Sequence, residues 1–166
     1  MYSDADVVRF IGNQLWVSVD KTRELLERIV EHPPAMPKGM GWFPVDLRAT
    51  GALVGAAIIR PPSADSNRTD PVIEIGWHLA RAHWGNGYAT EAGNGLLEWG
   101  FTVLDLDRLD AIVEEPNTAS HAVARRLGML DQGLTDAYSG RVMRHYTLNR
   151  EDWLARGLPR VLSSTT

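Results

Sequence analysis

Cysteine is absent from the 166-residue sequence. This absence excludes disulfide bonds, thiolate metal ligands and a cysteine nucleophile. No run of about 18 apolar residues occurs, so no membrane-spanning helix is predicted. The N-terminal stretch MYSDADVVRFIG has no basic region followed by an apolar core, unlike a signal peptide. We therefore expect a cytoplasmic protein that does not contact a membrane.

An excess of positive charge is also missing. Seventeen Lys and Arg residues stand against 21 Asp and Glu residues, a net charge of −4. This balance argues against a nucleic acid as partner. No cluster of His, Asp and Glu has the spacing of metal ligands, so no metal is predicted. The length and a hydrophobic content of 44% fit one domain over residues 1–166.

The chain alternates between helical and strand-like segments. Gly12 is expected to end a short first helix, and Ser18 to cap a second one with an apolar face of Leu25, Leu26, Ile29 and Val30. Next we expect a hairpin over 42–60 that turns at Thr50-Gly51, with Pro44 on an edge or at a bulge. The remaining expectations are a polar loop over 61–71, strands over 72–79, 108–113 and 141–149, and helices over 88–104, 117–128 and 150–157.

This order predicts an α/β (α+β) fold with a mixed, mostly antiparallel central sheet flanked by helices. In the helix over 88–104, Ala92, Leu96, Trp99 and Val103 recur at helical spacing and predict its apolar face. Asn117 is a predicted helix cap, and Gly128 lies just past the end of the same helix.

The stretch ARAHWGNGYATEAG, residues 80–93, places Gly85 and Gly87 between a strand and a helix. The first amides of a helix have no partners within it, and without a Cβ at the glycines an anion can approach them closely. Thr90 adds a hydroxyl. The stretch is not a P-loop, because no Gly-Lys-Ser/Thr follows, and Thr90 replaces the third glycine of a dinucleotide fingerprint. A phosphate site and an ordinary turn both remain open at this point.

Two motifs together resemble the GNAT superfamily of acetyl-CoA-dependent N-acetyltransferases, and most closely its ribosomal-protein N-terminal acetyltransferase branch. They are WGNGYATEA, residues 84–92, and NTASHAVARRLGM, residues 117–129. The resemblance extends over roughly residues 1–150 and implies two central strands that splay apart around the thioester. The stretch YSDADVVRFIG resembles the part of the family that follows a first strand and most of a first helix, so either these elements are absent or the sequence starts late. Their absence would expose a sheet edge that a homodimer could cover.

The resemblance also implies the residues that bind acetyl-CoA. The end of a strand would pair with the pantetheine arm, main-chain amides of the glycine stretch would hold the pyrophosphate, and an asparagine would hydrogen-bond the arm. The residues assigned to this site are Trp77, His78, Leu79, Trp84, Gly85, Asn86, Gly87, Tyr88, Ala89, Thr90 and Asn117.

The catalytic side chains are harder to assign. Alternation along the strand places Glu74, Gly76 and His78 on one face, and Glu74 is the leading candidate for the base, with Glu114 as its competitor. The family's catalytic tyrosine position is Ala124 here, and the resemblance implies that Ser120 serves the departing thiolate instead. His83 and His145 are expected to be surface or loop histidines.

The sequence thus predicts an enzyme that moves an acetyl group from acetyl-CoA to a primary amine, either a protein N-terminus or a small molecule. Direct transfer in a ternary complex is expected, because no cysteine is present to carry an acyl intermediate. A non-catalytic coenzyme A-binding or sensor module is the alternative, and a phosphate-binding domain unrelated to acyl transfer is a third.

Overall fold

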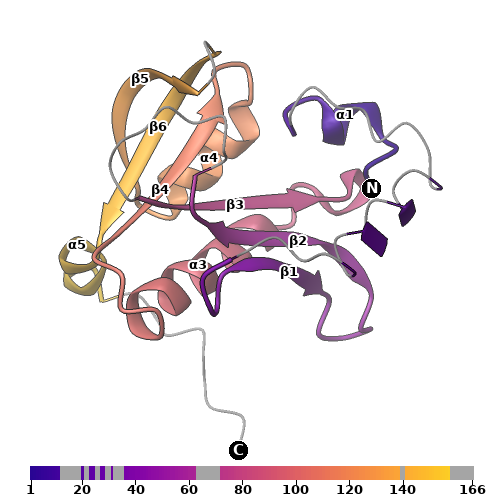
Figure 1. Ribbon diagram of the computed structural model, residues 1–166, viewed down its shortest axis with the longest axis horizontal. Helices are drawn as coiled ribbons and strands as arrows, with labels where there is room; N and C mark the ends of the chain where they lie inside the picture. The colour runs from indigo at the N-terminus through magenta and orange to yellow at the C-terminus, as the bar shows by residue number, and fades with distance from the viewer. Residues whose placement is uncertain are drawn as a thin grey trace, which may run out of the picture.

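The computed structural model describes residues 1–11, 20, 23–24, 27–28, 31, 36–62, 72–138 and 141–157. For residues 137 and 138 it describes the backbone alone. Among the described residues, three strands follow the short first helix, and helices are interspersed among the later strands (Figure 1). In chain order the elements are α1 (Ala5–Val8), β1 (Gly41–Asp46), β2 (Leu53–Arg60), β3 (Ile73–Leu79), η1 (Arg81–His83), α3 (Tyr88–Thr102), β4 (Arg108–Glu114), α4 (Thr118–Arg126), β5 (Leu130–Tyr138), β6 (Arg141–Asn149) and α5 (Arg150–Ala155).

One six-stranded sheet in the order β1-β2-β3-β4-β6-β5 organises the molecule. Every neighbouring pair is antiparallel except β3 and β4, which are parallel. The predicted mixed, mostly antiparallel sheet is confirmed. So is the hairpin over 42–60, and Pro44 lies in the edge strand β1, where its missing N–H removes no bond from a central ladder.

The parallel pair β3 and β4 is joined over a very short length. Only Ile73 with Leu109 and Glu74 with Asp110 are in register, although β3 continues to Leu79 and β4 to Glu114. Figure 1 shows β4 rising away from β3 beyond this point. The predicted splay is confirmed, and it leaves facing backbone edges unpaired in the middle of the sheet.

The hydrophobic core lies between one face of the sheet and helices α3, α4 and α5. Alternate strand residues such as Ile59, Leu109 and Tyr146 meet Leu97 of α3 there, and all four are fully buried. Alternation along the strands directs the intervening residues to the opposite face. The sheet therefore has one apolar face and one face that carries polar groups.

Two details differ from the sequence-based expectation. Val103 is 51% exposed, because α3 ends at Thr102 and Val103 is its C-cap, outside the apolar face. The edge strand β5 was not predicted, since Asp131, Gly133 and Asp136 are poor strand formers and pairing with β6 determines their conformation. The expectations for Gly12, for the helix capped by Ser18 with its face at 25–30 and for most of the loop at 61–71 fall outside the described residues.

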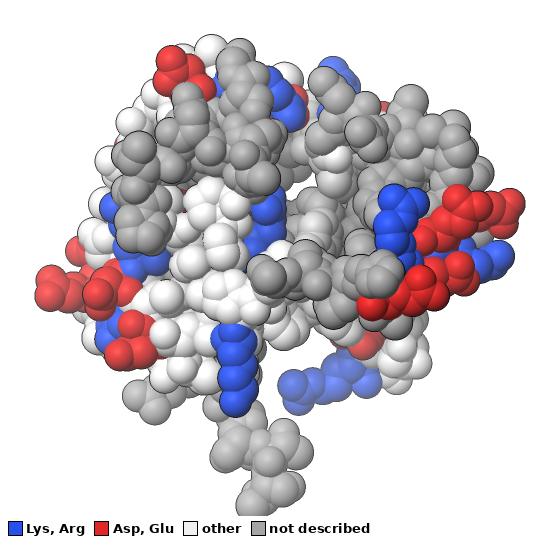
Figure 2. Space-filling view, in the orientation of Figure 1, with Lys and Arg blue, Asp and Glu red and all other residues white. Residues whose placement is uncertain are grey.

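The charged side chains of the face in Figure 2 include both signs. Figure 2 shows acidic and basic side chains close together at the left and right margins of the face in view, and further basic side chains near its middle and lower edge. Within the described part of the chain, no helix has both the length and the apolar character needed to cross a membrane.

Leu97→Ala tests the position of the core. Leu97 is fully buried, so the truncation leaves a cavity, and we expect the free energy of unfolding to fall by about 2–5 kcal/mol. Leu154→Ala makes the same chemical change at a side chain that is 59% exposed, and it should alter stability by no more than about 0.5 kcal/mol. Chemical denaturation of both variants measures the difference, and equal losses would contradict this core.

Candidate active site

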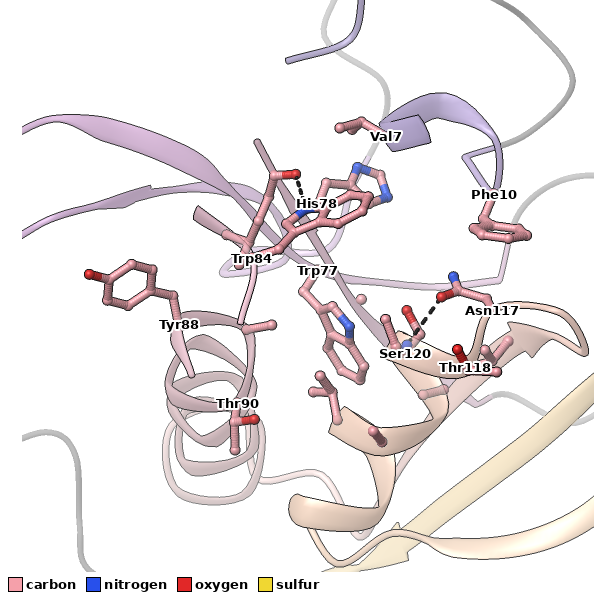
Figure 3. A pocket seen from close by; sticks show the side chains of 18 of the residues that line it. Val7, Phe10, Trp77, His78, Trp84, Tyr88, Thr90, Asn117, Thr118 and Ser120 are labelled. Atoms are coloured by element: carbon pink, nitrogen blue, oxygen red, sulfur yellow. Dashed lines mark hydrogen bonds between the residues drawn. The ribbon is translucent and has the colours of Figure 1, made fainter. Parts of the chain in front are cut away.

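A cavity of about 1230 Å³ opens where β3 and β4 separate. Twelve of the thirteen residues assigned to the site from the sequence line it (Figure 3). The exception is Glu74. The lining comes from α1 and the segment after it, the end of β3, the glycine loop with the first turns of α3, the end of β4, α4 and one residue of β6. These residues fall within 6–11, 75–79, 83–94, 111–114, 116–126 and at Met143.

The glycine loop joins η1 to α3 in a left-handed backbone. Gly85 has φ 77° and Gly87 has φ 84°, values that favour glycine because a Cβ would strain them. Gly87 is the N-cap of α3, and its carbonyl accepts from the amides of Thr90 at 2.9 Å and Glu91 at 3.0 Å. A Cβ built on either glycine meets no atom within 4 Å. The space beside the loop is therefore open to a ligand.

The amides of this loop are the main feature of the site. Among the residues that the structure describes, none of the five backbone N–H groups from Gly85 to Ala89 has a hydrogen-bond partner. They lie at the N-terminus of a helix of 15 residues, whose dipole adds partial positive charge there. Unpartnered amides in that position bind phosphate groups. The arrangement fits the pyrophosphate of a nucleotide-like ligand.

Trp84 and Asn86 hold the loop in place by side-chain bonds to the backbone. The indole Nε1 of Trp84 donates to the carbonyl of Leu79 at 2.8 Å, and Nδ2 of Asn86 donates to the carbonyl of Trp84 at 3.0 Å. Trp84 is 45% exposed, so its part in the site is to tie the loop to the end of β3. These bonds keep the loop amides in a fixed position before any ligand binds.

The edge of β3 offers a second set of backbone groups. The N–H of Ala80 donates to the carbonyl of Val54 in β2. In an antiparallel pair, every second residue directs its N–H and C=O groups toward the partner strand, so His78 also directs its backbone groups toward β2. By the same alternation, Trp77 directs its N–H and C=O toward the gap, and Leu79 its N–H. The carbonyl of Leu79 is already bonded to Trp84. An extended, amide-containing ligand can pair with this edge as an added strand does.

On the other side of the gap, Asn117 caps α4 as predicted. Its side-chain oxygen accepts from the amide of Ser120 at 3.1 Å, which Figure 3 shows as the dashed line between them. This bond orients the side-chain amide and leaves its NH₂ group as the donor available to a ligand. Asn117 and Ser120 both line the cavity. Gly128, with φ 74°, follows the C-cap of α4, as also predicted.

His78 reaches the cavity as a neutral side chain. Its Nδ1 lies 3.2 Å from the hydroxyl of Tyr2, and the ring meets Trp42 edge-on with centroids 5.3 Å apart. Burial, together with the positive charge of Arg60, lowers the pKa of His78 to about 4. An imidazole with this pKa binds protons weakly at neutral pH. His78 is suited to hydrogen bonding and is a poor base.

The two candidate glutamates differ in position. Glu74 is in register with Asp110 at the closed end of the gap and does not line the cavity. Glu114 lines it, and its carboxylate is paired with Arg141. Neither observation tests a catalytic role, so those of Glu74 and Ser120 remain predictions.

The first helix and the segment after it also contribute to the site, since Asp6, Val7, Arg9, Phe10 and Ile11 line the cavity. The prediction that His145 is a surface or loop residue was wrong: it lies in β6, is 18% exposed and is bonded to buried Asp110. His83 lies in η1 and lines the cavity. Among the described side chains, no group of three or more His, Asp and Glu is placed to hold a metal ion.

Comparison with known proteins gives a consistent family. A family model described as an acetyltransferase (GNAT) domain matches residues 1–130. The chain is 28% identical over 137 residues to the uncharacterized N-acetyltransferase p20 of Bacillus licheniformis, an alignment that covers 82% of this chain and 74% of that protein. It is 41% identical over 95 residues to the uncharacterized protein YkkB of Bacillus subtilis (strain 168), covering 55% of this chain and 53% of that protein.

Solved structures share the fold. A GNAT-family acetyltransferase from Bacillus anthracis superposes with a TM-score of 0.71 at 25% identity, covering 90% of this chain and 85% of that one. The spermidine N-acetyltransferase from Vibrio cholerae, solved in complex with CoA and spermine, gives a TM-score of 0.68 at 19% identity, covering 92% and 88%. At that identity the second likeness concerns the fold alone. Because the family model matches residues 1–130, which is most of the chain, the chain belongs to the GNAT acetyltransferase family.

Proposed function

We propose that the protein transfers an acetyl group from acetyl-CoA to a primary amine by direct attack in a ternary complex. One observation carries the proposal: a single cavity joins the five unpartnered loop amides to the unpaired edge of β3. The loop amides can hold a diphosphate, and the edge of β3 can pair with an extended chain that contains amide groups. Acetyl-CoA contains a diphosphate followed by such a chain. The catalytic class follows from the family, and the acceptor and the residue roles are proposals.

The amides of Gly85 to Ala89 and the hydroxyl of Thr90 hold the pyrophosphate. Trp77 pairs its backbone with the pantetheine arm, and the side-chain NH₂ of Asn117 donates to the same arm from the facing side. Bound there, acetyl-CoA supplies an activated acyl carbon in the gap. The unpaired edge of β3 thereby gains the hydrogen-bond partners that β4 does not provide.

The reaction needs a neutral amine, a donor for the oxyanion and a stabilised thiolate. The amide of Leu79, directed to the gap, is placed to donate to the oxyanion of the tetrahedral intermediate. The hydroxyl of Ser120 donates a hydrogen bond to the sulfur as the C–S bond breaks. A buried alanine, Ala124, occupies the position where the family often has a tyrosine. Ser120 is therefore our candidate for this task.

The acceptor is either an α-amino group or a small alkylamine. The resemblance to the ribosomal-protein branch supports a protein N-terminus. A small amine is the other candidate, because the same fold also occurs in a spermidine N-acetyltransferase. An α-amino group has a pKa of about 8, against about 10.4 for a lysine side chain, so far more of the former is neutral at pH 7. A peptide acceptor thus makes a smaller demand on a base.

Gly87→Val tests the phosphate site. The new side chain occupies the open space beside the loop, and we expect acetyl-CoA to bind at least about tenfold more weakly in calorimetry. Gly51→Val is the matched control, because Gly51 also has a positive φ, 69°, and open space around it, but lies in the β1–β2 turn. Wild-type affinity in the Gly87 variant would argue against this loop as the phosphate site. Absence of binding to the wild type would overturn the proposed function.

Ser120→Ala tests the thiolate donor. Loss of a hydrogen bond to a charged group, worth about 1.5–3 kcal/mol, predicts a fall in kcat of roughly 10- to 100-fold with little change in acetyl-CoA affinity. Thiol release measured with a dye gives kcat. An unchanged kcat would remove Ser120 from the mechanism.

An acceptor screen tests the substrate class. Purified protein is incubated with acetyl-CoA and either peptides with free N-termini or small amines, including spermidine, and acetylated products are identified by mass spectrometry. We expect one class to be acetylated clearly faster than acetyl-CoA is hydrolysed. Tight acetyl-CoA binding without acetylation of either class would contradict the proposed acceptor.

A further inference from the structure

The cavity extends to the outer face of the sheet, the face opposite the core. Ile75 of β3 and Ala111 of β4 point into the core, so the alternate residues His78 and Ile112 point outward. Both of these line the cavity, and so does Met143, which is on the outer face of β6. Helices α3 and α4 cover the core face, and the glycine loop lies at the start of α3. The outer part of the cavity is therefore separate from the proposed phosphate site.

The N-terminal segment closes this outer part from the other side. The hydroxyl of Tyr2 lies 3.2 Å from Nδ1 of His78, so the segment packs against the outer face of β3. Val7, Phe10 and Ile11 of the same segment line the cavity. Figure 3 shows Val7, Phe10 and His78 on one side of the cavity, away from the start of α3. An acceptor that enters from the outer face therefore passes between this segment and the sheet.

The space between them, here called the outer compartment, has largely apolar walls. Its apolar side chains are Val7, Phe10, Ile11, Ile112 and Met143. Burial of an apolar group against such walls is favourable in proportion to the area removed from water. The compartment is therefore suited to the apolar part of a substrate.

The two carboxylates that the described residues bring to this compartment are each paired with an arginine. Asp6 forms an ion pair with Arg81, and Glu114 forms one with Arg141. Glu91 also lines the cavity, but it lies in the first turn of α3, beside the proposed phosphate site. Within the part of the chain that the structure describes, the outer compartment thus offers no unmatched carboxylate to a second ammonium group.

Positive groups act on the same space. Arg9 lines the cavity, its guanidinium lies 5.2 Å from the centroid of the Phe10 ring, and among the described side chains no carboxylate is paired with it. On the sheet, burial and the positive charge of Arg60 lower the pKa of His78 to about 4. Desolvation and like charge disfavour the imidazolium form of His78, and they act in the same way on any cation held beside it.

We propose that the acceptor is a primary amine that carries one positive charge on an apolar body, and that polyamines are poor substrates. This inference rests on the proposed acetyl transfer and deepens it by naming the chemistry of the acceptor. The apolar body packs against the walls formed by Val7, Phe10 and Met143, and the amino group reaches the thioester in the gap.

The proton balance of the reaction explains why the number of charges matters. An N–H bond of the ammonium group breaks, its proton goes to solvent, and the electron pair on nitrogen forms the C–N bond with the thioester carbon. The C–S bond breaks with its pair on sulfur, which takes a second proton from the acetylated nitrogen. A monoamine is thus uncharged when it reacts. A polyamine keeps another charge in the compartment, where no free carboxylate among the described residues balances it.

Two pairs of probe amines test the inference. Hexylamine and 1,6-diaminohexane share one carbon chain, and leucinamide and lysinamide share an α-amine. In each pair only the second compound has an additional ammonium group. For wild-type protein with acetyl-CoA, we expect kcat/KM to be at least about tenfold higher for the singly charged member of a pair that reacts. Thiol release measured with a dye gives the rates, and mass spectrometry identifies the products.

Phe10→Ala tests the apolar wall. The truncation removes apolar area that the chain of hexylamine would bury, so we expect KM for hexylamine to rise by about tenfold while acetyl-CoA affinity stays at the wild-type value. Phe43→Ala is the matched control, because it makes the same change at a side chain of β1 that does not line the cavity. It should keep the wild-type KM.

Arg141→Gln tests the effect of the paired carboxylate. It leaves Glu114 without its cation, so we expect the preference for hexylamine over 1,6-diaminohexane to fall by about fivefold or more. Arg144→Gln is the control on the same strand, because Arg144 pairs with Glu115 and Asp131, which do not line the cavity. It should keep the wild-type preference.

The possible failures are distinguishable. An equal or higher kcat/KM for the doubly charged member of either pair would overturn the inference and leave acetyl transfer in place. Acetylation of none of the four amines by a protein that binds acetyl-CoA would also overturn it. Wild-type KM in Phe10→Ala, or wild-type preference in Arg141→Gln, would contradict the placement of the acceptor in the outer compartment. A wild type that does not bind acetyl-CoA would instead overturn the proposed function.

Discussion

The separation of β3 from β4 after two residues in register is the constraint on which the site depends. Within a sheet, backbone N–H and C=O groups need partners, and a parallel pair that opens in the middle leaves facing edges without them. The groups on β3 that β4 does not meet, at Trp77 and Leu79, face a cavity of about 1230 Å³. In the proposed function, an extended ligand supplies the hydrogen-bond partners that β4 does not give to these groups.

The glycine loop gives that ligand a fixed end. The loop leaves β3 at the open end of the gap, and bonds from Trp84 and Asn86 hold its amides in place. A helix of 15 residues continues from it and is anchored in the core through Leu97 and Phe101. In the proposed mode of binding, a phosphate held by this loop would be coupled to the rigid part of the molecule, and the same framework would position the acyl group at the other end of the ligand.

Electrostatics divide the outer face of the sheet into groups with separate tasks. Burial keeps His78 neutral, Glu114 is matched by Arg141, and Asp110 is committed to His145, Thr147 and Arg108. Away from the gap, Arg144 bridges Glu115 and Asp131. The bond from Arg144 lowers the pKa of Glu115, and the backbone N–H of Gly133, together with Arg144, lowers the pKa of Asp131.

Features that depend on local chemistry could be predicted from the sequence. Left-handed glycines at 85 and 87, the cap formed by Asn117 and the helix that follows the glycine loop all arise from contacts between residues close in the chain. Tertiary structure alone decided the rest. The strand β5 forms because β6 pairs with it, Glu74 lies at the closed end because Asp110 is its neighbour, and His145 reaches Asp110 across 35 positions. Such outcomes depend on strand order and register, which bring together residues whose sequence neighbourhoods contain no information about each other.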